Sequence, residues 1–169
     1  MKTALILPLA LMVSACGLQP MYAGGGSGAV ARGLASIEVA PIQGRAGWLV
    51  RNALSDNLAI TGKADTAPRY RLDVRLDENL EGFALLSDDT IGRERLTLRA
   101  RYQLVDLENG EIVLDATSGS DAGIDVMSSD YATIAAEQTA LENLAVDVAN
   151  RIVTNVALEL RSQGRAAGQ

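Results

Sequence analysis

The chain has 169 residues, 15 basic and 21 acidic side chains and no histidine, giving a formal net charge of −6. A negative balance argues against a general nucleic-acid binder and against adhesion to an anionic membrane by charge alone. Without histidine the commonest general base and metal ligand is absent, and no phosphate loop or Ser-x-x-Lys motif is present. Asp88, Asp89 and the acidic residues of 121–125 match no EF-hand spacing. We therefore expect neither an enzyme nor a metal or organic cofactor.

The first 15 residues have the pattern of a secretory signal peptide. Lys2 supplies a positive charge, and residues 4–12 are apolar apart from Pro8. A charged start followed by a short apolar run and small residues is typical of such signals. The run is too short to cross a bilayer as a helix, which needs about 20 residues.

Val13-Ser14-Ala15-Cys16 closes this segment and resembles the lipobox of bacterial lipoproteins. The resemblance implies that the Cys16 thiol carries a diacylglycerol, that cleavage occurs just before Cys16 and that the new amine is N-acylated. Cys16 is the only cysteine, so no intramolecular disulfide is possible. Gly17 stands where lipoproteins retained in the inner membrane often have Asp, which favours the outer membrane. An ordinary secreted protein with a stray cysteine, or a cytosolic protein with an apolar start, are the alternatives.

We expect four segments: a signal peptide over 1–15, a lipidated N-terminus and flexible tether over 16–33, one domain over 34–163, and a polar tail over 164–169. The tether is rich in glycine and small residues. Lys2 is the only charged residue of the signal, so the mature chain keeps 14 basic and 21 acidic side chains, a net charge of −7.

The domain is predicted to begin with a strand and a helix. Apolar residues alternate over 34–42, which indicates a short strand ending at Pro41. Over 48–60 they recur at helical spacing, and Gly62 ends this helix. Residues 69–77 alternate strictly between apolar and charged side chains, as in a strand with one buried face.

A polar loop is predicted over 81–92, followed by a second alternating strand over 95–104. The sequence Glu108-Asn109-Gly110-Glu111 indicates a hairpin turn, because Asn-Gly accepts positive φ angles. The returning strand is expected over 112–117, and a connection rich in Gly, Ser and Asp over 118–125.

An apolar stripe predicts a long final helix over 130–161. The element order is therefore β-α-β-β-β-α. It indicates an α+β fold in which two helices pack on one face of a four-stranded sheet.

The opposite face of the middle strands would carry half of the basic residues of the mature chain. Arg forms bidentate hydrogen bonds with phosphate and carboxylate groups, so this concentration indicates either an anion-binding or partner-binding surface. The alternative is a solvated face on which arginines pair with Asp73, Asp77, Glu94 or Glu111 at about 0.2–1 kcal/mol each. Acidic partners are expected to be too few on that face. The residues are Arg69, Arg71, Arg75, Arg93, Arg95, Arg99 and Arg101.

Three stretches resemble the LPS-assembly lipoprotein family LptE in its alphaproteobacterial form. Residues 16–22, Cys-Gly-Leu-Gln-Pro-Met-Tyr, are similar to the start of the mature family chain. Residues 45–54, from Arg45 to Leu54, resemble the approach to its first helix, and Ser129-Asp130-Tyr131-Ala132 the start of its last. An aromatic is missing at Leu18, and the glycine-rich tether also departs from the family.

The resemblance implies a non-enzymatic lipoprotein at the periplasmic face of the cell outer membrane. It would associate with and plug the LPS-translocating β-barrel LptD, assist its assembly and help insert lipopolysaccharide into the outer leaflet. The candidate residues for contact with LPS or the partner are Arg71, Arg75, Arg93, Arg95, Arg99 and Arg101. Two other classes stay open: an auxiliary lipoprotein of an ABC-type lipid transport system, and an envelope-stability module without a ligand.

Overall fold

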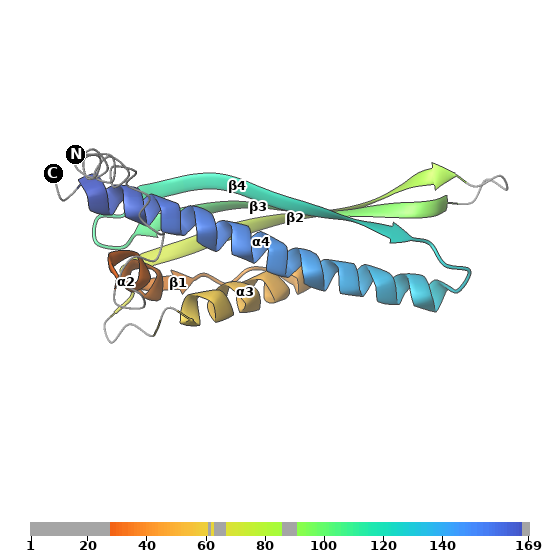
Figure 1. The fold of residues 1–169 in the computed structure, drawn as a ribbon, viewed down its shortest axis with the longest axis horizontal. Coiled ribbons are helices and arrows are strands. Elements are labelled where there is room, and N and C mark those ends of the chain that lie inside the picture. The colour runs from red at the N-terminus through yellow and green to blue at the C-terminus, as the bar shows by residue number, and fades with distance from the viewer. Residues whose placement is uncertain (1–27, 61, 63–66, 86–90, 167–169) are drawn as a thin grey trace, which may run out of the picture.

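The computed structural model describes residues 28–60, 62, 67–85 and 91–166 and shows one sheet with helices along one of its faces (Figure 1). The signal peptide, Cys16 and most of the expected tether lie outside the described residues. The predicted α+β class, with two main helices on a four-stranded sheet in the order β-α-β-β-β-α, is confirmed. In chain order the elements are α2 (Ala29–Ala35), β1 (Ile37–Val39), α3 (Gly44–Ala59), β2 (Tyr70–Leu85), β3 (Ile91–Asp106), β4 (Ile112–Asp125) and α4 (Asp130–Ala166).

The sheet has the strand order β1-β2-β3-β4 and mixes parallel and antiparallel pairing. β1 pairs with β2 in parallel over three residues only, whereas β2, β3 and β4 form a long antiparallel meander. The β3–β4 turn is the one expected at Asn109-Gly110. Gly110 has a φ of 74°, and its N–H donates to the Asp106 carbonyl.

The meander strands are longer than the sequence pattern predicts. β2 and β3 run into the stretch expected as a loop over 81–92, and β4 continues through the expected connection over 118–125. The β4 residues that face the helices after Ala116 are mostly small, with Ile124 the first large buried one. An alternation of small side chains carries little hydrophobic signal, so the expected connection is wrong and the segment is a strand.

The two ends of the domain also differ from expectation. A short helix, α2, occupies residues predicted as tether and as the start of the first strand. Its Ala31 and Leu34 are buried, and Gly33 packs against Leu160 of α4. α4 continues to Ala166 and so includes the start of the expected polar tail. None of the helices in the described part of the chain is both long and apolar enough to cross a membrane.

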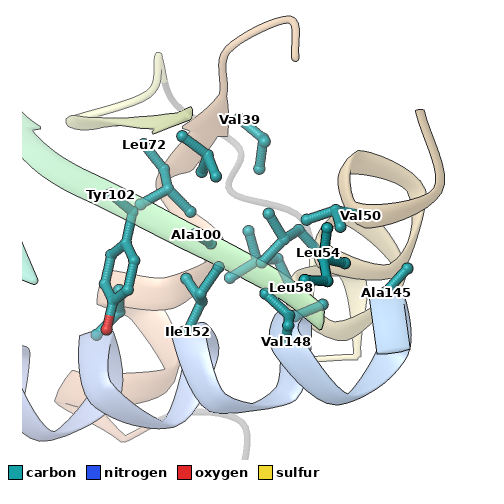
Figure 2. Close-up of a cluster of buried hydrophobic side chains, with 14 of the residues drawn as sticks. Val39, Val50, Leu54, Leu58, Leu72, Ala100, Tyr102, Ala145, Val148 and Ile152 are labelled. Carbon is teal, nitrogen blue, oxygen red and sulfur yellow. The ribbon is translucent and has the colours of Figure 1, made fainter. Parts of the chain in front are cut away.

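The core lies between the sheet and the two main helices (Figure 2). Val148 and Ile152 of α4, at helical spacing, and Leu54 of α3 are fully buried against the inner faces of β2 and β3. Each side chain of this kind stabilises the fold by about 1.5–3 kcal/mol relative to an exposed position. All strands of the meander contribute even-numbered residues to this core, so their odd-numbered residues face away from the helices.

One polar contact crosses the core. The Tyr102 ring is fully buried (Figure 2). Its hydroxyl accepts a hydrogen bond of 2.7 Å from Asn155 Nδ2 of α4. Asn155 also donates to Ser118 Oγ of β4 at 3.3 Å. A buried phenol needs such a partner, so this contact fixes the register of α4 along the sheet.

Gly47 allows α3 to approach the segment that follows β1. A Cβ at this position would lie 2.7 Å from the carbonyl oxygen of Ile42, closer than real Cβ contacts. The residue is buried in the first turn of α3. The absence of a side chain at residue 47 therefore allows residues 40–43 to lie close against the helix.

Replacing Ile152 with Ala is expected to lower the free energy of unfolding by about 2–5 kcal/mol, because it leaves a cavity in a fully buried site. The matched control is Val146→Ala on the same helix, where the side chain is 49% exposed. That change should alter stability by about 0.5 kcal/mol or less. Urea denaturation followed by circular dichroism measures both, and equal losses would contradict the assigned core.

Candidate functional site

The open face of the sheet, opposite the helices, carries the charged side chains of the meander. We call its six arginines the arginine face: Arg71, Arg75, Arg93, Arg95, Arg99 and Arg101. All six are exposed, and strand pairing places them along one face, as the alternation in the sequence predicts. Arg69, which the sequence placed with them, lies just before β2 and bonds Asp106 Oδ2 at 3.3 Å instead.

Three members of the arginine face are held in ion pairs. Arg71 bonds Asp73 on its own strand at 2.9 Å, while β4 supplies the partners of the other two. Arg93 Nε lies 2.7 Å from Asp125 Oδ1, and Arg101 Nη2 lies 2.9 Å from Asp115 Oδ2. Hydrogen bonding to these carboxylates raises the pKa of each of the three guanidinium groups. Pairs this exposed contribute little stability.

The expectation that acidic partners are too few on this face is wrong. β4 runs to Asp125, so Asp115, Asp121 and Asp125 lie on the same face as the arginines. Of the partners that the sequence suggested, Glu94 points toward the helices, where one of its oxygens is buried without a hydrogen bond. Asp121 and Asp125 were not expected on this face because the sequence pattern ends the strand at residue 117, whereas β4 runs to Asp125.

Arg95 has a different contact from the others. Its guanidinium lies over the Phe83 ring, 5.1 Å from the ring centroid. A cation held over an aromatic face at an exposed site gains about 0.5–1 kcal/mol. Phe83 itself is half exposed near the far end of β2. This arginine is therefore positioned by a ring rather than by a carboxylate.

Arg75 and Arg99 form no ion pair within the described residues. Arg75 is the direct cross-strand partner of Arg101, and Arg99 is two residues from Arg101 on the same face of β3. Directly opposed residues have Cβ atoms about 4.5–5.5 Å apart, and like charges there repel. Arg99 also lies across β4, because a Cβ at Gly119 would be 3.3 Å from its Cγ. These three side chains form the central cluster: Arg75, Arg99 and Arg101.

A hollow of about 720 Å³ opens beside the central cluster. Arg75, Arg101 and Gln103 line it from the sheet, and residues 40–43 line it from the segment after β1. Two guanidinium groups and an amide can together donate several hydrogen bonds to one anionic group. Asp73, which bonds Arg71, also lines the hollow, and Asp115 accepts from both Arg101 and Gln103. The hollow therefore suits a phosphate or carboxylate that competes with Asp115 for Arg101.

The pKa of the Asp115 carboxylate depends on this hydrogen-bond network. Hydrogen bonds from Arg101 and from Gln103 hold the pKa of Asp115 below its ordinary value of 3.8. A group whose pKa is lower in the folded than in the unfolded protein stabilises the fold above its unfolded pKa. This contribution is therefore full above a pH of about 3.8, and it is lost as the pH falls from there through the lower pKa that Asp115 has in the folded protein.

Arg101→Ala is expected to raise the pKa of Asp115 toward 3.8, because it removes the largest cause of the shift. Carboxyl-carbon NMR titration of Asp115 measures the change. Arg71→Ala, which removes an arginine bonded to another carboxylate, is the control and should leave the Asp115 pKa as it is. An Asp115 pKa that does not respond to Arg101→Ala would contradict the assigned bonds.

A family model described as LptE, lipopolysaccharide-assembly, matches residues 34–156. No curated protein gave a match. Among solved structures, a lipoprotein from Caulobacter crescentus CB15 is 30% identical with a TM-score of 0.64, over 80% of this chain and 98% of that one.

Two more distant structures share the fold. Rare lipoprotein B from Shewanella oneidensis is 11% identical with a TM-score of 0.56, over 79% of this chain and 98% of that one. A minor lipoprotein from Acinetobacter baumannii is 12% identical with a TM-score of 0.54, over 72% and 90%. The family match covers most of the described domain, including all four strands, α3 and most of α4. This chain belongs to the LptE family of lipopolysaccharide-assembly proteins.

Proposed function

We propose that this protein is an outer-membrane lipoprotein that binds within the LPS-translocating β-barrel LptD, assists its assembly and helps to insert lipopolysaccharide into the outer leaflet. Members of the LptE family are not enzymes, and the sequence contains no histidine. The observation that carries the finer proposal is the central cluster of three exposed arginines, two of which, Arg75 and Arg101, line a hollow.

The shape of the domain supports a role inside a wide barrel. α4 has 37 residues, which corresponds to a length of about 55 Å. The meander runs along the same axis, and the two layers form an elongated body (Figure 1). Such a body presents two unlike long surfaces, one helical and one made of charged strand residues. A wide lumen could hold it lengthwise, with the open sheet face turned toward the wall or toward passing lipopolysaccharide.

The central cluster supports contact with the phosphates of lipid A. The planar guanidinium group binds a phosphate through two parallel hydrogen bonds. Arg75 and Arg99 form no ion pair within the described part of the chain, although Asp77 stands directly across from Arg99, so an incoming phosphate need not first break an ion pair with either. Arg71 and Arg93, by contrast, would have to give up Asp73 and Asp125. We therefore place binding at the central cluster rather than evenly over the arginine face.

A lipid on Cys16 would hold the domain at the membrane by one end. α2, the first described element, lies at the same end of the body as the last turns of α4 (Figure 1). Each buried methylene of an acyl chain contributes about 0.8 kcal/mol, so several chains anchor a protein stably. With the lipid at this end, the elongated domain would extend away from the leaflet in which the lipid is inserted.

The double substitution Arg75→Gln with Arg99→Gln is expected to weaken binding of purified LPS about tenfold or more, because charge-assisted hydrogen bonds each contribute about 1.5–3 kcal/mol. The matched control is Arg71→Gln with Arg93→Gln, which removes equal charge from the paired positions and should weaken binding less. Co-purification with LptD from detergent-solubilised membranes is measured on the same variants. If both LPS binding and co-purification stay unchanged in the Arg75/Arg99 variant, the site is wrong.

Cys16→Ser is expected to leave the protein in the soluble periplasmic fraction and to abolish incorporation of labelled palmitate, because no thiol remains for the diacylglycerol. Cell fractionation and metabolic labelling measure the two effects. Ser14→Ala, which keeps a small residue before the cysteine, serves as the control and should retain both label and membrane. Continued labelling of Cys16→Ser would overturn the proposed anchor.

A further inference from the structure

The outer edge of β2 is open for most of its length. The N–H of Tyr70 donates to Ser36, and the carbonyl of Leu72 accepts from Ala40 at 3.0 Å. β1 ends at Val39, and Ala40 is the last residue for which a bond to β2 is found. Backbone groups alternate in direction along a strand, so the even-numbered residues after Leu72 also point outward.

Leu76, Glu78 and Leu80 therefore present six backbone hydrogen-bonding groups at this edge. No described residue bonds to them: the backbone groups of the odd-numbered residues turn toward β3, as the Arg69 carbonyl does when it accepts from Leu107, and α3 covers the inner face of the sheet. An exposed strand edge of this length is a template for another strand. Two devices that protect such edges, proline and lysine, are absent from residues 75–81.

The side chains of this edge are acidic and apolar. Asp77 and Glu81 lie on the open face, directly across from Arg99 and Arg95 of β3, and Glu78 lies on the helix side; none of the three forms an ion pair within the described residues. Glu81 accepts one hydrogen bond, from the Asn79 side chain at 2.7 Å. Leu80 is 45% exposed. The edge thus combines three unpaired negative charges with apolar surface that nothing in the described chain covers.

We propose that residues 75–81 of β2 take up an extended segment of a partner protein in which lysine or arginine alternates with apolar residues. Its backbone would complete the hydrogen bonds of the free edge. Its apolar side chains would cover Leu76 and Leu80 on the helix side, and its cations would meet Asp77 and Glu81 on the open face. Strand addition of this kind takes affinity from the main chain and specificity from alternate side chains.

Charge argues against two other occupants. A second copy paired antiparallel about Glu78 would place Arg75 opposite Glu81, but it would set Glu78 against Glu78, which is destabilising, and leave Asp77 opposite Asn79. Residues 17–27 of the chain itself contain no charged side chain, so they would leave all three carboxylates unmatched. A basic segment of another protein is the occupant that the edge complements.

The inference rests on the proposed function only in taking LptD as the protein that carries the segment. The test is amide hydrogen exchange, at residue resolution, on the full lipidated protein alone and in the purified complex with LptD. We expect the amides of Leu76, Glu78 and Leu80 to exchange at least tenfold more slowly in the complex, as newly bonded amides do. The outward amides of β4, the other edge strand, should be unchanged.

Two variants separate backbone pairing from general instability. Glu78→Pro removes one outward N–H without breaking the β2–β3 ladder, because proline is tolerated at an edge position. Thr117→Pro makes the same change on the edge of β4 and is the matched control. We expect Glu78→Pro to reduce recovery of the LptD complex about tenfold, and Thr117→Pro to leave it near wild type. If Glu78→Pro fails to fold, exchange in the unaltered complex still decides.

Each other outcome overturns the inference. A complex that forms without slower exchange at β2 leaves the proposed function in place and removes this docking edge. No complex at all contradicts the proposed function and this inference together. Slow exchange in the free protein that increases with concentration indicates a second copy, and slow exchange at every concentration indicates the chain's own N-terminal segment.

Discussion

The packing of α4 along the inner face of the sheet is the constraint on which the rest of the structure depends. Its buried stripe runs through Leu144, Val148, Ile152 and Val156, and the Tyr102–Asn155 hydrogen bond sets where along the sheet the helix lies. Because α4 and α3 cover one face, the odd-numbered residues in the regularly paired part of the meander face the other way. The arginine face is thus a geometric consequence of a hydrophobic contact on the opposite side of the strands.

The fold could be predicted where side chains carried a strong period. The alternation at 69–77 and 95–104 located the centres of β2 and β3, and the helical stripes located α3 and α4. Element ends could not be read in the same way. β4 continues through small residues because pairing with β3 and burial of Ile124 outweigh their weak pattern, and α2 forms because Leu34 packs into the core.

The site shows the same division between local pattern and tertiary pairing. Strand alternation was enough to place six arginines on one face, because facing depends only on parity. Which of them are engaged depends on the neighbouring strands. Asp115 and Asp125 became partners only through the full length of β4, and the opposition of Arg75 and Arg101 requires the β2–β3 register. Register is decided by turns and burial far from the arginines themselves.

The close approach at Gly47 has a consequence for the stiffness of the hollow. Residues 40–43 form one wall of it, and they are held against α3, whose next turns are part of the hydrophobic core. The wall therefore shares the rigidity of the core, while the opposite side consists of long arginine stems that can rotate. An anion would be accommodated by moving side chains alone, so little backbone order would have to be gained on binding.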